Sequence, residues 1–215
     1  MGRGRRIGQW QQPDPPFSFR QGHPRGTSGG ARGRGTVARR FRGEFHQKVD
    51  AKGRVSIPAL FRRVIEGCDP DWSEGKRPNL VIVYGDHRRK YLECYTIEAI
   101  DDSDAQIDAM PRGTVERKML ERLFHGQSLP TQVDEDGRIV LPQKLRAKID
   151  LGDEALFIAS GDRFLIWKPD TYVDEEESRA EAWLEAQGED FDPMSLLPDR
   201  IGFGDGGRRG GEEPR

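Results

Sequence analysis

Two stretches of this chain are near copies of one another. Residues 47–65 read QKVDAKGRVSIPALFRRVI, and residues 131–149 read TQVDEDGRIVLPQKLRAKI. They align without a gap and share seven of nineteen positions, which are Val, Asp, Gly, Arg, Pro, Arg and Ile in that order. Most of the remaining apolar positions exchange Val, Ile, Leu and Phe. This repeat predicts two copies of one supersecondary unit that bury their apolar sides together.

Each copy has the pattern of a strand, a tight turn, a second strand and a short helix. The first strand ends at Val49 or Val133 and is followed by Asp-x-x-Gly. Aspartate at the start of a turn accepts backbone N–H groups, and glycine at its fourth place adopts a positive φ at little cost. Proline then ends the second strand, because it cannot donate to a ladder but suits the first turn of a helix. We expect strands over 54–57 and 138–141, and helices over 59–65 and 143–149.

A further pair of strands follows each predicted helix. In the first half these strands cover 80–84 and 90–96, and in the second half 155–160 and 163–168. A turn at Gly-Asp separates the members of each pair. Each half is therefore expected to be a β-hairpin, a helix and a β-hairpin, in an α+β fold.

Helices are expected between and after the two halves. Thr114 is a plausible N-cap of a helix that ends near Gly126. The apolar residues on one face of this helix are Val115, Met119, Leu120, Leu123 and Phe124. A second helical stretch is expected over 97–109. Residues 171–187 predict a charged helix with Tyr172, Trp183 and Leu184 as its anchors.

The composition indicates that the ends of the chain do not join the folded part. Charged residues make up 33% and hydrophobic residues 34% of the chain, with 26 glycines and 14 prolines. Residues 1–40 are rich in Gly and Arg and predict a disordered extension, and residues 191–215 predict a disordered tail. Residues 1–42 hold ten arginines against Asp14, whereas the whole chain has a net charge of −2. Residues 1–42 therefore carry +9 and the remainder −11, so the folded part could bind a polyanion only through a local cationic patch.

Other compositional features favour a cytoplasmic protein. No apolar run approaches the roughly 18 residues that span a membrane, and the basic N-terminus lacks the apolar stretch of a signal peptide. Cys68 and Cys94 are too few for a disulfide framework. We expect no membrane partner, no cofactor and no small-molecule substrate.

The two Asp-x-x-Gly-Arg-(Val/Ile)-x-(Ile/Leu)-Pro motifs, linked by a helix, resemble the MraZ family. The Phe-Arg-Gly-Glu at 41–44 is similar to the usual start of that family, and Glu116-Arg117 through His125-Gly126 is similar to its central helix. The resemblance covers about residues 41–172. The chain departs from the family in the forty residues before Phe41, which are either a basic arm or the product of a start placed too early, with Val37 as the alternative start.

This resemblance implies a double SpoVT-AbrB domain, in which two pseudo-symmetric halves interlock as one swapped-hairpin β-barrel. The implied domains are 44–96 and 127–170, with linking helices over 97–126 and a C-terminal helix over 171–190. Family members are transcription factors associated with the nucleoid. They bind direct repeats upstream of the division and cell-wall gene cluster, usually repress it, and assemble into rings.

The first turn has the side chains expected of a DNA reader. Arginine can bond guanine or chelate a phosphate, so Arg54 is the leading candidate. Lys52 lies on the other side of Gly53, which would let the backbone approach DNA closely. Arg42 and Lys48 lie on the adjoining strand. Residues 41–65 contain six cationic and two acidic side chains.

The second turn is less basic. Residues 131–149 contain four cationic and three acidic side chains, and Glu135 and Asp136 occupy the turn itself. We therefore expect the first copy to make most of the DNA contact, with Arg138 as a weaker contributor. Asp50, Asp134 and Gly137 are expected to brace the turns.

Several alternatives remain open at this level. The Asp50–Arg54 and Asp134–Arg138 pairs can serve only to brace the turns, and Lys52 can be a solvated loop charge. A Mg²⁺ site at 134–136 lacks companion ligands, and His87 and Cys94 lack the spacing of a zinc site. Two other functions compete with DNA binding. The protein could be an antitoxin-like binding protein, or an RNA-binding protein that uses the Gly/Arg arm. An enzyme is the least supported class.

Overall fold

The structure is a computed structural model that describes residues 40–197. The predicted Gly/Arg extension, apart from Arg40, and the end of the predicted tail from 198 onward lie outside the described residues.

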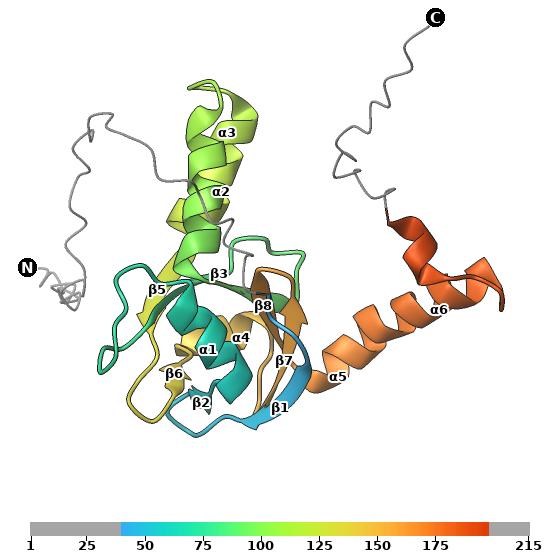
Figure 1. Ribbon diagram of the computed structural model, residues 1–215, viewed down its shortest axis with the longest axis horizontal. Helices are drawn as coiled ribbons and strands as arrows, with labels where there is room; N and C mark the ends of the chain where they lie inside the picture. The colour runs from blue at the N-terminus through green and yellow to red at the C-terminus, as the bar shows by residue number, and fades with distance from the viewer. Residues whose placement is uncertain (1–39, 198–215) are drawn as a thin grey trace, which may run out of the picture. The chain divides into compact units, whose positions relative to one another are not determined.

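Each half contains four strands and one short helix among the described residues (Figure 1). The first half contributes β1 (Glu44–Lys48), β2 (Arg54–Ser56), α1 (Ala59–Gly67), β3 (Asn79–Val83) and β4 (Tyr91–Tyr95). The second half contributes β5 (Ser128–Gln132), β6 (Arg138–Val140), α4 (Gln143–Lys148), β7 (Glu154–Ser160) and β8 (Arg163–Trp167). These bounds agree with the predicted elements to within two residues.

The strands pair across the halves. They form a six-stranded sheet in the order β1-β7-β8-β4-β3-β5 and a two-stranded ribbon of β2 and β6, and every ladder is antiparallel. The prediction of an α+β fold is confirmed. Between residues 40 and 197 the ladders form an open sheet and a separate ribbon, so the expected closed barrel is not present.

The predicted hairpin within each repeat copy is wrong. In the first copy β1 and β2 are joined only by the single bridge between Val49 and Val55, because β1 pairs with β7 and β2 pairs with β6. In the second copy β5 pairs with β3 of the first half. The later hairpins, β3–β4 and β7–β8, do form. The first two strands of each half thus complete their hydrogen bonds with the other half.

One apolar core joins the halves. Phe61 of α1 and Phe164 of β8 are fully buried, and their ring centroids lie 5.2 Å apart. Phe41 contacts both rings edge-on, at 5.1 and 5.2 Å. Phe157 of β7 stacks on Phe164 at 5.5 Å. Aromatic pairs in this geometry stabilise a core beyond the area they bury, so neither half keeps an intact core without the other.

A helical pair connects the halves and projects from the sheet (Figure 1). It consists of α2 (Ile97–Ala109), α3 (Val115–Leu120) and a π-helical turn, η1 (Glu121–Gly126). The Thr114 hydroxyl accepts the Arg117 N–H at 3.3 Å and so caps α3. The predicted helix over 114–126 therefore exists, but its second half is π-helical. Its apolar face is only partly covered, since Val115 is 74% exposed.

Helical segments follow the second half as α5 (Pro169–Tyr172), the π-helical η2 (Val173–Glu177), α6 (Ser178–Gln187) and the 3-10 helix η3 (Pro193–Leu196). The predicted anchor Tyr172 packs edge-on against Trp167, at 5.7 Å. The other two predicted anchors are wrong, because Trp183 and Leu184 are 46% and 47% exposed.

None of the helices between residues 40 and 197 has the length and apolar character needed to cross a bilayer.

The shared core predicts a large difference between two adjacent residues of α1. Phe61→Ala should lower the free energy of unfolding by about 3 to 5 kcal/mol, because it opens a cavity between the halves. Leu60→Ala, which removes a side chain that is 54% exposed, should change it by no more than about 0.5 kcal/mol. Chemical denaturation of both variants measures the difference, and equal losses would contradict a core built around Phe61.

Candidate nucleic-acid interface

The first repeat turn is closed by one carboxylate. Asp50 Oδ1 accepts the backbone N–H groups of Lys52 and Arg54, each at 2.9 Å, and Oδ2 accepts the Arg54 Nε–H at 2.6 Å. The Gly53 N–H completes the turn by donating to the Asp50 carbonyl at 2.8 Å. The hydrogen bonds from Arg54 hold the pKa of Asp50 below its ordinary value, so the carboxylate is charged at neutral pH. The Arg54 side chain is thus held to the turn through its Nε.

The second turn has the same hydrogen-bond pattern as the first but different charged residues at its tip. Asp134 Oδ1 accepts the backbone N–H groups of Asp136 and Arg138, at 3.0 and 2.8 Å. The Arg138 guanidinium lies between two carboxylates, with Nε 3.4 Å from Asp134 and a terminal nitrogen bonded to Asp136. Glu135 pairs with Arg77 at 2.8 Å. Burial raises the pKa of Asp134, but the hydrogen bonds and charge of Arg138 outweigh it and lower the pKa overall.

The two turn glycines are buried at the contact between the halves. The Gly53 carbonyl accepts the Leu141 N–H at 2.7 Å, and the Gly137 carbonyl accepts the Ile57 N–H at 2.9 Å. A Cβ on Gly53 would lie 2.4 Å from the Leu141 carbonyl oxygen, and one on Gly137 would lie 2.1 Å from the Arg62 side chain. Both glycines have positive φ, at 79° and 75°. Gly53 therefore packs against the second half, and its close contact is with the Leu141 backbone.

The pairing of β2 with β6 brings the two turn arginines onto one surface. Arg54 lies opposite Val140 and Ser56 opposite Arg138, while Val55 and Ile139 form the rung between them. Directly opposite residues of an antiparallel pair share a face, and alternate residues along a strand do also. Val55 and Ile139 are buried. Arg54, Ser56, Arg138 and Val140 therefore share the outer face, which we call the ribbon face. As diagonal neighbours, the two arginines have Cα atoms about 7 to 8 Å apart.

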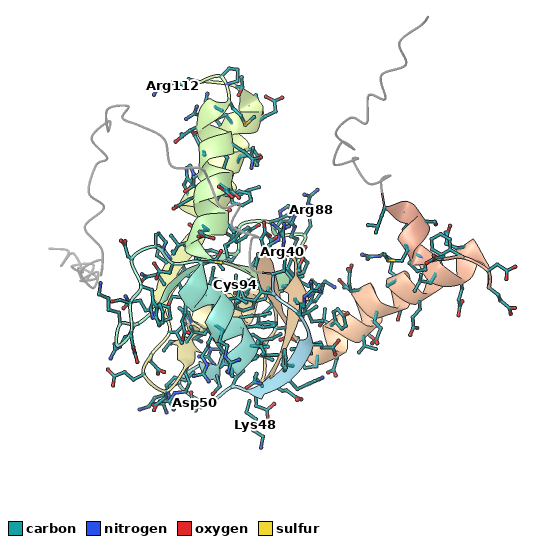
Figure 2. All side chains as sticks on the ribbon, in the orientation of Figure 1. Arg40, Lys48, Asp50, Arg88, Cys94 and Arg112 are labelled. Carbon is teal, nitrogen blue, oxygen red and sulfur yellow. The ribbon has the colours of Figure 1, made fainter. Side chains whose placement is uncertain are left out.

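The remaining predicted residues fall in two places. Lys48 and Lys52 are exposed and flank Asp50 at the first turn, and Figure 2 shows Lys48 and Asp50 at the same end of the fold. Arg42 lies at the opposite end of β1, beside the β7–β8 turn, where the Phe41 N–H donates to the Gly161 carbonyl at 2.9 Å. Lys48 is the last residue of β1, and Arg42 lies two residues before the strand begins, so the length of the strand, about 13 Å from Glu44 to Lys48, separates them. The structure therefore removes Arg42 from the predicted cluster.

Two arginines that sequence analysis did not assign complete the turns. Arg62 of α1 covers Gly137, and Arg146 of α4 covers Gly53. Arg146 Nε also donates to the Leu141 carbonyl at 3.1 Å. These arginines occupy equivalent positions of the repeat, and they are the one shared arginine pair outside the turns. Their identity in the two copies is the sequence signal that could have singled them out. Only the exchanged pairing shows that each arginine contacts the turn glycine of the other copy.

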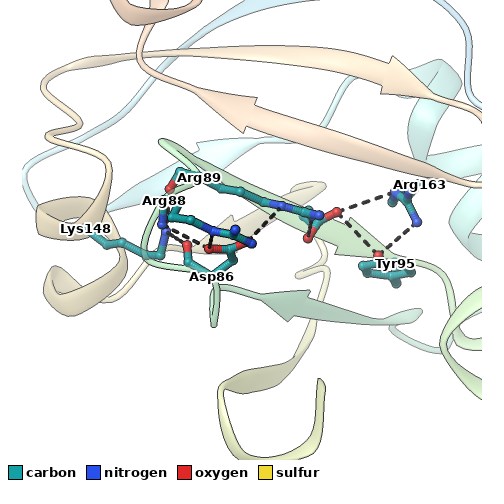
Figure 3. A network of polar contacts seen from close by, with 7 residues as sticks. Asp86, Arg88, Arg89, Tyr95, Lys148 and Arg163 are labelled. Atoms are coloured by element: carbon teal, nitrogen blue, oxygen red, sulfur yellow. Dashed lines mark hydrogen bonds and ion pairs between the residues drawn. The ribbon is translucent and has the colours of Figure 1, made fainter. Parts of the chain in front are cut away.

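A polar network away from the ribbon face also joins the halves (Figure 3). Glu93 of β4 is nearly buried and pairs with Arg89 and with Arg163 of β8. Arg163 also donates to the Tyr95 hydroxyl at 2.9 Å, and burial raises the pKa of Tyr95 to about 12. Lys148 of α4 donates to the Arg89 carbonyl at 2.7 Å. This network links β4 to β8 and the β3–β4 turn to α4.

Within the described residues, no group of three or more His, Cys, Asp or Glu side chains could hold a metal ion. Cys68 and Cys94 are both buried.

Comparison with known proteins identifies the relatives of this chain. A family model described as "MraZ protein, putative antitoxin-like" matches residues 124–191. A transcriptional regulator MraZ of Ruegeria pomeroyi is 68% identical over 161 residues, which cover 75% of this chain and 96% of the relative. Another from Ruegeria sp. is 65% identical over the same shares. One from Cereibacter sphaeroides is 47% identical over 168 residues, which cover 75% of this chain and 97% of the relative.

These relatives identify the protein as a transcriptional regulator and not an enzyme. The chain belongs to the MraZ family.

The packing of the turn glycines predicts that one added methyl group at Gly53 lowers the free energy of unfolding more than the same change at another glycine with positive φ. Gly53→Ala combines a positive φ with a clash against the Leu141 carbonyl, whereas Gly75 has a φ of 86° with nothing within 4 Å of a Cβ. Gly75→Ala should therefore cost about 1 to 2 kcal/mol from the backbone conformation alone. Gly53→Ala should cost at least about 1 kcal/mol more, because the turn must move away from β6. Denaturant titration compares the two variants, and equal losses would show that Gly53 does not pack between the halves.

Proposed function

We propose that this regulator binds double-stranded DNA through the ribbon face and the first repeat turn. The observation that carries the proposal is the pairing of β2 with β6, which places Arg54 and Arg138 on one exposed surface. A two-stranded ribbon fits the major groove of B-DNA. The arginine fork can bond O6 and N7 of guanine, or chelate a phosphate.

The exchanged pairing supports the AbrB-like swapped-hairpin arrangement for this chain. β1 and β2 reach into the second half, and β5 and β6 reach into the first. In this proposal residues 44–96 and 127–170 are two SpoVT-AbrB domains, joined by helices over 97–126. The second domain is needed for DNA binding because β6 supplies half of the ribbon.

The two turns contribute unequally to DNA binding. At the first tip Lys52 is exposed, and the carboxylate of Asp50 holds only Nε of Arg54. At the second tip, the position equivalent to Lys52 is Asp136, which binds a terminal nitrogen of Arg138. A phosphate that approaches Arg138 must therefore displace Asp136 and pass near Glu135. Arg54, Lys52 and Lys48 make the main contacts, and Arg138 adds a weaker one.

The target and the assembly follow from the family to which the chain belongs. The protein represses the division and cell-wall gene cluster by binding direct repeats upstream of it, and it acts in the cytoplasm at the nucleoid. A surface with three or four cations binds weakly at physiological salt. Assembly of several copies into a ring would engage several repeats at once, which can raise the avidity by roughly 10² to 10⁴.

A footprint on the protein's own upstream region tests the proposal. The wild-type chain should protect closely spaced direct repeats, and Arg54→Ala should weaken this binding by about 1 to 3 kcal/mol per contacted site. Arg112→Ala is the matched control, because Arg112 is exposed at the far end of the α2–α3 projection (Figure 2). Absence of protection by wild type, or an equal loss in both variants, would refute the ribbon face as the DNA reader.

Exchange of the two turn tips tests their unequal roles. Asp136→Lys should strengthen operator binding, because it removes the carboxylate that holds Arg138 and adds a cation. It should also steepen the slope of log K against log salt by about one for each new phosphate contact. Lys52→Asp should weaken binding, and the double exchange keeps the net charge of the wild type. Fluorescence anisotropy over a salt series measures all four proteins. If Asp136→Lys bound the operator no more tightly than the wild type, the claim that Asp136 holds Arg138 away from DNA would be contradicted.

A further inference from the structure

Within residues 40–197, the helix α6 is covered by neither half of the fold. All ten residues of α6 are exposed, and Trp183 contacts only the edge of the Phe191 ring among aromatic side chains of the described region. A helix of this length is marginal in water unless one of its faces packs against another surface. The half-exposed Trp183 and the adjacent Leu184 therefore form an unpartnered apolar patch on α6.

This segment carries a strong negative charge. Residues 173–192 contain nine acidic side chains and a single basic one, Arg179. Glu177, Glu181 and Leu184 recur at i, i+4 and i+7, so carboxylates share one face of the helix with Leu184. A surface that binds this helix must combine apolar contact with positive charge.

A groove with that combination lies between the β3–β4 turn and the helical segment formed by α3 and η1. It encloses about 600 Å³ between the β3–β4 turn, residues 85–88, and the helical residues Met119, Arg122 and Leu123. Met119 is half-exposed and Leu123 is half-buried. Arg88 and Arg122 are among its lining residues. Asp86, the one acidic residue of the lining, pairs with Arg88 at 2.8 Å, so Arg122 is the lining cation that faces an incoming carboxylate.

The helix is not seated in the groove of its own chain. Glu175 of η2 pairs with Lys90, which anchors the start of the segment beside the β3–β4 turn. From there η2 and α6 run on without a break to Gln187. At 1.5 Å per residue, Trp183 lies about 12 Å along this rod from Glu175. Since every α6 residue is exposed, the rod carries the apolar patch away from the groove beside its base.

We propose that the acidic α6 helix of one copy docks into the basic groove of a second copy, with Trp183 and Leu184 against Met119 and Leu123. Arg122 then meets the carboxylates of the helix, Glu181 among them. This contact is a self-association surface that links one chain to the next. It gives a physical basis to the assembly that the proposed function requires, and in that respect it rests on the proposed function.

Sedimentation velocity of full-length chains over a range of concentrations tests the contact. The wild type should sediment as species heavier than one 24.4 kDa chain. Trp183→Ala with Leu184→Ala should raise the apparent dissociation constant by tenfold or more, on the order expected for an aromatic residue at the centre of an interface. Val115→Ala with Leu60→Ala removes two exposed apolar side chains elsewhere and should leave the assembly intact.

Charge reversal provides a second test that preserves apolar contact. Arg122→Glu should weaken assembly, as should Glu181→Arg, and the two changes together should assemble better than either alone. A monomeric wild type, an unaltered assembly of the Trp183/Leu184 variant, or a double reversal no stronger than the single ones would each overturn the proposal.

Binding to a DNA that carries a single repeat separates this contact from the DNA site. The Trp183/Leu184 variant should bind the single repeat as the wild type does and lose only the gain from adjacent repeats. Arg54→Ala should lose single-repeat binding while it keeps the assembly of the wild type. The DNA site and the self-association contact can therefore fail independently, and each experiment shows which of the two has failed.

Discussion

The strand that follows the first turn forms its hydrogen-bonded ladder with the strand that follows the second. Arg54 to Ser56 pairs with Val140 to Arg138, and β1 and β5 likewise pair with the opposite half. Because backbone groups in a buried ladder must find partners, this exchange makes the two halves one folding unit. The buried glycines, the arginines that cover them and the phenylalanine core all lie along the contact that this pairing creates.

The same constraint accounts for the surface that we propose for DNA binding. The rung of Val55 and Ile139 is buried, so the alternate positions of both strands must face outward. The repeat places arginine at two of these positions, and the pairing brings them within reach of one groove. The turn tips then set the sign of the local charge, through Lys52 in one copy and Asp136 in the other. Similar backbones therefore present different electrostatic surfaces.

Much of the local structure could be predicted from the sequence, because it depends on neighbouring residues. The Asp-x-x-Gly turns, the proline at the start of each short helix and the Thr114 cap are interactions within a few positions. The pairing could not be predicted from the repeat, since a strand pattern is equally compatible with a hairpin partner and an exchanged one. For that reason the sequence predicts neither the packing of Gly53 against the second half nor the contacts of Arg62 and Arg146 with the turn glycines.

Hydrogen exchange of the full-length protein with and without its operator tests the central claim most directly. Bound DNA should slow the exchange of backbone amides in peptides that cover residues 50–56 and 136–140, because the ribbon and its turns lie against the duplex. Peptides over the tip of the α2–α3 projection, around Arg112, should exchange as in the free protein. Protection confined to the projection or to the sheet, with the ribbon unchanged, would contradict the claim that the exchanged β2–β6 pair reads DNA.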